Sequence, residues 1–246
     1  GDSGDREQIM KANPSVPHRT SWAAISRMRK NLPSEESWRL EGLGIWYAEA
    51  PGVVIAPEDW DALHDEQSFG ADDIALGIDV NPERTHASIG MAARRPDGQY
   101  HVELVEERRG TAWVVPYVVE RVKSNNLRAV VIDGQSPAAP FIDELARNKV
   151  RVTRTGVLEM GLACAGFYDK AVSGVLRHIG QHQLGTSLNE ARKRELPNGM
   201  WAWNRRGVAS DITPIVSVTL ALWAVDNSKV ERPRRGSGQG RRVVVG

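Results

Sequence analysis

The first 70 residues differ in pattern from the rest of the chain. Hydrophobic side chains at Trp22, Ile25 and Met28 recur at the spacing of a helix, and the pattern over 34–46 predicts another helix. Prolines interrupt this part, and its first stretch is too polar to form a hydrophobic core alone. We therefore expect residues 1–70 to be a helical arm, either packed on the next domain or left from a preceding one.

Residues 71–228 have the pattern of an α/β domain. Short apolar runs bounded by polar or turn residues predict strands over 74–80, 86–93, 100–107, 127–133, 150–154 and 200–204. Apolar positions that recur every three or four residues predict helices over 111–124, 140–148, 158–175, 188–196 and 212–225. Three consecutive antiparallel strands come first, and strands that alternate with helices follow. This order predicts a mixed sheet with helices on its faces, because parallel neighbours need crossover connections.

Composition adds mainly exclusions. Lys and Arg number 32 against 31 Asp and Glu, so the net charge of +1 does not by itself indicate a nucleic-acid partner. No apolar run approaches the roughly 20 residues that cross a bilayer, and the first residues lack a secretory signal. Cys164 is the single cysteine, which excludes an internal disulfide and indicates a small buried residue. We expect a cytoplasmic protein, with a basic, glycine-rich and disordered tail over 229–246.

Three aspartates stand where chemistry is plausible. Asp79 ends the first predicted strand, Asp133 ends the fourth, and Asp211 begins the last predicted helix. Each has a simpler explanation, because aspartate at a strand end forms turns and aspartate at a helix start serves as an N-cap. If they converge, their oxygens suit a pair of divalent cations about 4 Å apart, which clamp the attacking and leaving oxygens of a phosphodiester.

Other carboxylates and histidines are weaker candidates. Glu106 and Asp169 are reserve ligands if one of the three aspartates fails, although the third strand, with Glu107 on it, is more typical of a solvated face. His178 and His182 are four residues apart, but a zinc site would need a third ligand nearby. A place near the rim of the site, or an ordinary core or surface histidine, explains His178 better.

Basic residues flank the three aspartates. A DNA-facing patch and a solvated surface both explain this set, which comprises Arg84, Lys170, Arg177, Arg205 and Arg206, with His178 beside it. Trp201 and Trp203 alternate on a short strand, so both point to one face, and packing under the final helix is a better explanation than base stacking.

The motifs around these aspartates resemble those of one family. GIDVNPERTHASI, AVVIDGQSPAAPFIDELA and WAWNRRGVASDITPIVSVTLALWA are similar to the three motifs of the nuclease domain in large terminase subunits of tailed bacteriophages. The segments KANPSVP and ESWRLEGLGIWYAEAPGVVIAPEDW resemble the part that links the packaging ATPase to that nuclease. The resemblance therefore covers nearly the whole chain. It implies a ribonuclease H-like fold with Asp79, Asp133 and Asp211 as metal ligands.

The same resemblance implies a function. It indicates an endodeoxyribonuclease that uses two Mg²⁺ or Mn²⁺ ions to cut concatemeric double-stranded phage DNA during packaging, with little sequence preference. The implied partners are DNA, the small terminase subunit and the portal protein, and the implied location is the host cytoplasm. No G-x-x-x-x-G-K-[ST] motif occurs, so we expect only the C-terminal portion of a large terminase, without its ATPase.

Two alternatives remain at this point. An inactive ribonuclease H-like module could bind DNA or dock on the portal without cutting, and would not bind metal at Asp79. An actin-like or sugar-kinase-like ATPase could also use the 77–80 strand, but its phosphate loop would need small residues where this chain has Asn81, Pro82 and Glu83.

Overall fold

The computed structural model describes residues 6–32, 38, 52–205 and 211–228. The chain divides into two compact units, Gly1–Gly52 and Val53–Gly246. The smaller unit contains helices α1 (Arg6–Ala12) and α2 (Trp22–Asn31), the second of which the sequence predicted. Its apolar side chains gather around Ile9, Val16, Ile25 and Trp38. The helix expected over 34–46, apart from Trp38, and the tail expected over 229–246 lie outside the described residues.

The larger unit begins before the position that the sequence suggested. The segment after Gly52 contains helix α4 (Pro57–Asp61), and its side chains Val54, Ile55, Trp60 and Leu63 join the main hydrophobic cluster. The isolated bridge between His64 and His178 ties it to the rest of this unit. Residues 53–70 therefore belong with the sheet rather than with the arm. Their few apolar residues show no regular period, and only the tertiary fold buries them together.

A six-stranded mixed sheet forms the centre of the larger unit, in the order β5-β4-β1-β2-β3-β6. The strands are β1 (Asp72–Val80), β2 (His86–Arg94), β3 (Tyr100–Arg109), β4 (Ala129–Asp133), β5 (Thr153–Thr155) and β6 (Leu176–Arg177). The first three are antiparallel neighbours, whereas β4 runs parallel to β1, β5 to β4 and β6 to β3. This confirms the predicted mixed sheet. The sequence did not reveal β6, whose two residues are too few for a pattern.

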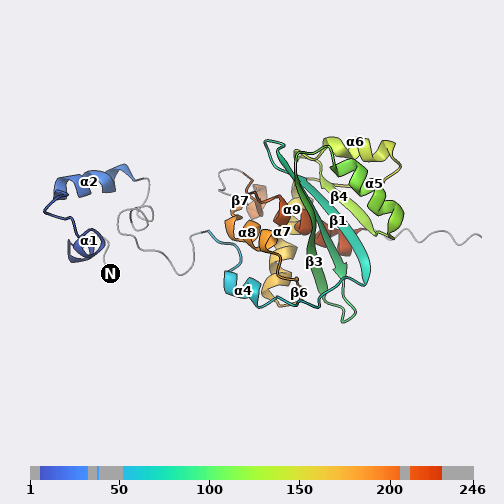
Figure 1. Cartoon of the computed structure of the whole chain (residues 1–246), viewed down its shortest axis with the longest axis horizontal. Coiled ribbons are helices and arrows are strands. Elements are labelled where there is room, and N and C mark those ends of the chain that lie inside the picture. The colour runs from blue at the N-terminus through green and yellow to red at the C-terminus, as the bar shows by residue number, and fades with distance from the viewer. Residues whose placement is uncertain (1–5, 33–37, 39–51, 206–210, 229–246) are drawn as a thin grey trace, which may run out of the picture. The chain divides into compact units, whose positions relative to one another are not determined.

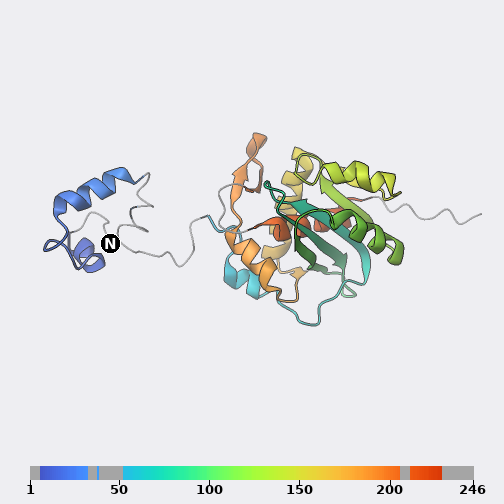
Figure 2. The same ribbon diagram turned by 45° about the horizontal axis from the view of Figure 1, so that its top comes forward.

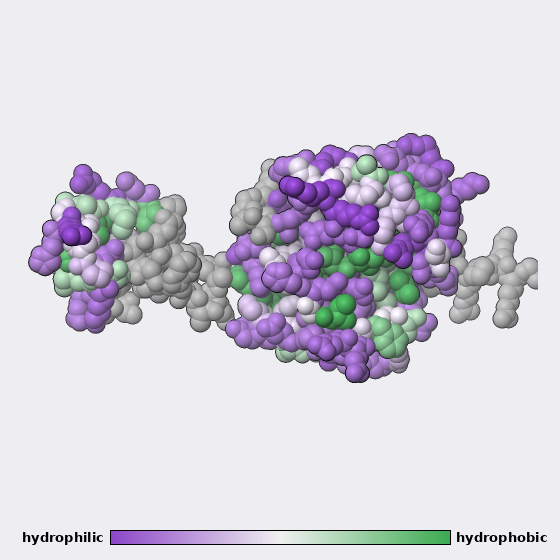
Figure 3. All heavy atoms as spheres, viewed as in Figure 1, coloured by the Kyte–Doolittle hydropathy of each residue, from purple (hydrophilic) through white to green (hydrophobic). Residues whose placement is uncertain are grey.

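Helices cover both faces of the sheet (Figures 1 and 2). On one face lie α5 (Val114–Ser124) and α6 (Pro140–Arg147), and on the other α7 (Val157–Val172), α8 (His182–Glu190) and α9 (Thr213–Asn227). Each face has its own buried apolar cluster, because successive strand residues point to opposite sides. The side of this unit that Figure 3 shows is mainly hydrophilic, with small apolar areas. None of the described helices is both long and apolar enough to span a membrane.

The helix predicted over 188–196 is wrong in its second half. Helix α8 ends at Glu190, and the chain continues as β7 (Lys193–Glu195), which pairs with β8 (Trp201–Trp203) in a separate hairpin. The residues over 191–196 favour helix by intrinsic propensity, but that preference is weak. Pairing with the strand that carries the two tryptophans outweighs it.

Helix α9 lies directly on the backbone of β1 and β2. Gly77 and Gly90 face each other across these strands, and a Cβ at Gly77 would lie 2.0 Å from the carbonyl oxygen of Ser217. A Cβ at Gly90 would lie 2.5 Å from the backbone nitrogen of Val218. Only glycine permits this close approach. The contact sets the position of α9, and with it the position of Asp211 just before its first turn.

Candidate active site

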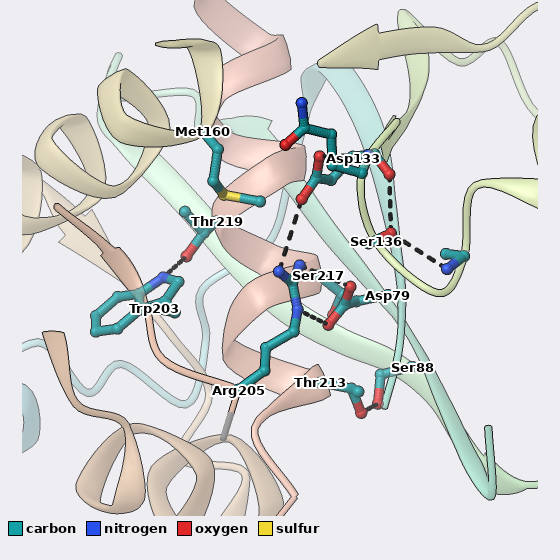
Figure 4. Close-up of polar contacts among 12 residues, drawn as sticks. Asp79, Ser88, Asp133, Ser136, Met160, Trp203, Arg205, Thr213, Ser217 and Thr219 are labelled. Atoms are coloured by element: carbon teal, nitrogen blue, oxygen red, sulfur yellow. Dashed lines mark hydrogen bonds and ion pairs between the residues drawn. The ribbon is translucent and has the colours of Figure 1, made fainter. Parts of the chain in front are cut away.

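The carboxylates of Asp79 and Asp133 are held by one guanidinium group. Asp79 lies near the end of β1 and Asp133 at the end of β4, and these strands are parallel neighbours. Arg205 donates from Nε to Asp79 Oδ2 at 3.2 Å and from Nη2 to Asp79 Oδ1 at 2.9 Å. Its Nη1 is 3.6 Å from Asp133 Oδ2 (Figure 4). The ends of parallel strands thus converge as the sequence predicted, with a cation from another part of the chain between them.

Asp79 is fully buried, and this alters its acidity. Its side chain has no exposed surface. Burial raises its pKa to about 6 from 3.8, against the attraction of Arg205, while nearby Asp133 adds a further increase. The free-energy cost of burying the charged Asp79 carboxylate exceeds the stabilisation that its two hydrogen bonds to Arg205 provide, so keeping this group charged is unfavourable. Such a group gains from a second cation.

Asp133 serves both as a turn former and as a site residue. Its Oδ1 accepts a hydrogen bond from the backbone N–H of Gln135 at 3.0 Å, and its backbone carbonyl accepts one from Ser136 Oγ at 2.8 Å. The bond from Gln135 N–H to the Asp133 side chain forms an Asx-turn, which is the turn-forming role that the sequence also suggested. It leaves Oδ2 facing Arg205, so the two roles are compatible.

Asp211 also combines two roles. Its Oδ1 accepts a hydrogen bond from the backbone N–H of Thr213 at 2.9 Å, at the beginning of α9. The hydroxyl groups of Thr213 and Ser88 are 2.7 Å apart, and Ser88 pairs with Asp79 across β1 and β2 (Figure 4). The other oxygen, Asp211 Oδ2, is buried and has no hydrogen-bond partner within the described part of the chain. Asp211 therefore supports the helix with one oxygen, while the other makes no hydrogen bond to the residues that the structure describes.

Glu107 is a fourth carboxylate that sequence reasoning assigned to a solvated face. It pairs with Ser88 across β2 and β3, so Asp79, Ser88 and Glu107 lie in one row across three strands. Burial, and then the charge of Asp211, raises the pKa of Glu107. The reserve ligand Glu106 instead forms an ion pair with Arg108 at 2.7 Å.

A β-bulge explains why Glu107 rather than Glu106 reaches the site. Ile89 pairs with Glu106 while its neighbour Gly90 pairs with Leu104, so Val105 has no partner on β2. The extra residue reverses the alternation of side chains beyond it. Without the bulge, Glu106 would stand opposite Ser88. Nothing in the local sequence indicates this shift.

The donor set fits hard divalent cations. It consists of carboxylate oxygens, including the buried Asp211 Oδ2, which has no partner in the described part of the chain. Such oxygens are the ligands that Mg²⁺ and Mn²⁺ prefer. In the described residues, however, no three acidic, histidine or cysteine side chains stand in a ready metal-binding arrangement. The guanidinium of Arg205 lies between two of the carboxylates and supplies the positive charge there.

The basic residues expected to face DNA are dispersed. Arg205 is in the carboxylate site itself, so its contact with Asp79 corrects the expected surface role. Arg84 lies in the β1–β2 turn, where it donates to the carbonyl of Pro137 and covers the Phe141 ring. Arg206 lies outside the described residues.

Lys170 and Arg177 lie at the opposite end of the sheet. Lys170 pairs with Asp226 at 3.0 Å near the end of α9, and Arg177 donates to the backbone carbonyls of Gly174 and Leu176. These positions adjoin the beginning of β3, whereas the carboxylates stand at the end of β1, which runs parallel to it. The structure does not bring these two residues to the candidate site.

The histidines and the second reserve ligand are also elsewhere. His178 is buried, stacks on Trp60 at 4.0 Å between ring centroids, and bonds the Trp60 carbonyl through Nε2 at 2.9 Å. Burial lowers its pKa. It is therefore an interior residue, which corrects its expected place beside a DNA-facing patch. Asp169 is exposed on α7, about 12 residues or ~18 Å along the helix from the end near β5.

Comparison with known proteins identifies the fold. No family model matches the chain, and no curated protein matches it by sequence. The chain is similar in structure to the large terminase of bacteriophage HK97, with 15% identity and a TM-score of 0.61 over 91% of this chain and 55% of that one. The large terminase nuclease of thermophilic phage G20c matches 69% of this chain with 97% of its own, at 16% identity and a TM-score of 0.50. Its magnesium-bound form matches 70% of this chain with 97% of its own, at 15% identity and a TM-score of 0.51.

These similarities show that the larger unit has the fold of a large terminase nuclease domain. They confirm the ribonuclease H-like mixed sheet, with helices on both faces, that the sequence predicted. The chain spans 55% of the length of the HK97 terminase structure that it matches.

Proposed function

We propose that this chain is a metal-dependent endonuclease that hydrolyses DNA phosphodiester bonds. The observation that carries the proposal is the convergence of Asp79 and Asp133 on one guanidinium, with Asp211 joined to the same row of residues through Thr213 and Ser88. Strand ends in this fold place these groups together although they are far apart in sequence. Two strand-end carboxylates that share one guanidinium, with a third acidic residue at the start of α9, suit phosphodiester chemistry better than any structural need of the sheet.

Asp79, Asp133 and Asp211 would hold two divalent cations, Mg²⁺ or Mn²⁺. When bound, such cations would lower the pKa of water and stabilise the negative charge on the departing 3′ oxygen. A relative of the same fold has been solved with bound magnesium, which supports this choice of ion. The protein's own contribution is to fix the carboxylates on rigid elements and to keep them poor in solvent.

Arg205 offsets part of the negative charge of the site. It forms three contacts with Asp79 and Asp133, so these groups need no metal in order to fold together. Cations that bind there would take over that charge and free the guanidinium to pair with a DNA phosphate, for which its planar group of donors is suited.

The proposed substrate is concatemeric double-stranded phage DNA, cut during genome packaging in the host cytoplasm. The site would contact phosphates rather than base edges, so little sequence preference is expected. The small terminase subunit and the portal protein are the proposed partners. This assignment rests on the fold shared with phage large terminases.

One observation favours a second candidate, an inactive module that binds DNA or docks on the portal. Arg205 already pairs with both Asp79 and Asp133, and the described residues contain no ready group of three metal ligands. If that ion pair is permanent, the site is a structural salt bridge. The nuclease remains the better account because Asp211 Oδ2 is buried and has no hydrogen-bond partner among the described residues, which a purely structural site would not require.

A plasmid-cleavage assay separates the two functions. With Mg²⁺ or Mn²⁺ the protein should nick and degrade plasmids of unrelated sequence, whereas Ca²⁺ should bind without supporting cleavage and excess chelator should stop it. Asp79→Asn, Asp133→Asn and Asp211→Asn should each abolish cleavage in folded protein. Asp169→Asn is the matched control and should cut normally.

Two results would contradict parts of the proposal. Cleavage that persists in chelator, or that survives Asp79→Asn, would exclude a metal-dependent nuclease at this site, whereas absence of cleavage with both Mg²⁺ and Mn²⁺ would favour the inactive module. Normal cleavage by Asp211→Asn alone would reduce Asp211 to a helix cap, because asparagine caps a helix about as well as aspartate.

A further inference from the structure

The turn that follows Asp133 is fixed by its own hydrogen bonds. It spans residues 134–139 between β4 and α6, and each of its backbone N–H groups donates within the described structure at 2.9–3.2 Å. Ser136 Oγ also donates to the Asp133 carbonyl (Figure 4). The first N–H groups of α6, those of Phe141 and Ile142, donate back to this turn at 3.0 Å. An anion bound here must therefore be held by side chains, because the backbone donors of the turn and of the start of the helix are already used.

Two arginines from separate elements are anchored on this turn. Arg84, between β1 and β2, donates to the Pro137 carbonyl, and its guanidinium carbon lies 5.4 Å from the centre of the Phe141 ring. Arg154, on β5, donates from Nη2 to the Gly134 carbonyl at 3.3 Å. Its side chain crosses Gly134 so closely that a Cβ there would lie 2.0 Å from the Arg154 Nε. Gly134 and Pro137 are three residues apart, so their backbones lie within about 11 Å of each other.

Both arginines keep most of their donors available for a ligand. Each side chain is exposed, and neither forms an ion pair with a carboxylate within the part of the chain that the structure describes. A guanidinium has five N–H groups, and one contact with a carbonyl leaves most of them for a second partner. Because the two groups are already oriented by the turn, they lose less side-chain freedom when they bind. Arg205 differs, because it lies buried between two carboxylates.

We propose that Arg84 and Arg154 form a phosphate clamp, which holds the backbone of the DNA strand beside Asp133. This inference rests on the proposed function and adds where its substrate lies. The carboxylates of the site repel phosphates, so positive charge next to them is needed to keep the strand in place. Arginine is suited to this task because its planar group of donors matches phosphate oxygens. The sequence gave no signal for Arg154, because only strand pairing brings β5 beside the end of β4.

The salt dependence of DNA binding tests the clamp. The affinity for a short labelled duplex is measured over a series of salt concentrations, in chelator so that no cleavage intervenes. Arg84→Gln and Arg154→Gln should each reduce the slope of log affinity against log salt concentration by about 0.9, the value for one phosphate contact. The ratio of wild-type to variant affinity should then fall about eightfold for each tenfold rise in salt. Arg154→Lys keeps the charge and should restore the wild-type slope.

Arg177→Gln is the matched control. Arg177 also donates to backbone carbonyls, those of Gly174 and Leu176, but it lies at the opposite end of the sheet. This variant should keep the wild-type slope. The melting temperature of each variant is measured as well, because the two clamp arginines also support the turn. Weaker binding with a lower melting temperature and an unchanged slope would show that they only hold the turn, and would overturn the inference.

The outcomes distinguish this inference from the proposed function. If both slopes are unchanged while plasmid cleavage depends on metal and on Asp79, the clamp is refuted and the nuclease stands. If both slopes fall but the wild-type protein cuts with neither Mg²⁺ nor Mn²⁺, the clamp is supported as part of a DNA-binding module and the nuclease is refuted. If wild type does not bind the duplex even at low salt, the clamp is refuted, and the cleavage assay decides the nuclease separately.

Discussion

Replacing Asp79 with asparagine should change how stability depends on pH. The side chain is fully buried, and burial raises its pKa to about 6 from 3.8. Asparagine has nearly the same shape and cannot titrate, so the variant isolates the free energy of charging this one group. At pH values where Asp79 is protonated, wild type and Asp79→Asn should be about equally stable.

The sign and the size follow from linkage. Because the folded protein binds this proton more tightly than the unfolded chain, the stabilisation is complete below about pH 4 and is lost as the pH rises through about 6. A pKa of about 6 against 3.8 corresponds to a loss of about 3 kcal/mol, at about 1.36 kcal/mol for each pH unit. Without metal, Asp79→Asn should therefore be more stable than wild type at pH 7 by about 3 kcal/mol.

Urea denaturation in chelator at half-unit steps from pH 4 to pH 7 measures this difference. The free energies of unfolding of the two proteins should coincide near pH 4 and separate mainly between pH 4 and 6. Added Mn²⁺ should reduce the separation at pH 7, because only wild type retains the charged ligand. Equal stability at pH 7, or a less stable variant, would show that Arg205 fully offsets the burial of Asp79 and that the site is an ordinary ion pair.

Three other changes test the packing and charge around the site. Gly90→Ala should lower the free energy of unfolding by about 3 kcal/mol in urea denaturation and reduce cleavage, because its Cβ would lie 2.5 Å from the backbone nitrogen of Val218. Gly185→Ala is the control: the nearest atom to its Cβ would be 3.9 Å away, so it should stabilise helix α8 by up to about 1 kcal/mol. Trp203→Phe should cost about 1–3 kcal/mol by calorimetry and leave cleavage intact, because it removes the 2.9 Å hydrogen bond to the last helix. Arg205→Gln should cost about 3–5 kcal/mol at pH 7 in chelator and should regain much of it with Mn²⁺; failure of Mn²⁺ to restore stability would argue against a cation site there.

Much of the fold was predictable because it depends on local pattern. The three antiparallel strands, the strand that ends at Asp133 and the apolar final helix all have a hydrophobic period that matches their geometry. Asp79 and Asp133 could be placed together because strands with parallel neighbours bring their ends to one edge of the sheet. Trp203 packs beneath α9 and Cys164 is buried, both as expected.

Other features depended on contacts between distant segments. The strand β7 replaced a predicted helix because pairing with β8 outweighs a small propensity. The bulge at Val105 brought Glu107 to the site in place of Glu106, and a one-residue shift leaves no sequence signature. His178 proved to be an interior residue because Trp60, far away in sequence, covers its ring.

The sequence by itself determined the alternation of strands and helices and the strand-end positions of Asp79 and Asp133, because hydrophobic period and turn chemistry are local. Only the tertiary structure decided that Arg205 stands between those carboxylates, and that Glu107 lies in one cross-strand row with Asp79. Charge compensation is a property of groups that meet in space. The pairing of strands and the close approach of α9 to Gly77 and Gly90 set which groups those are.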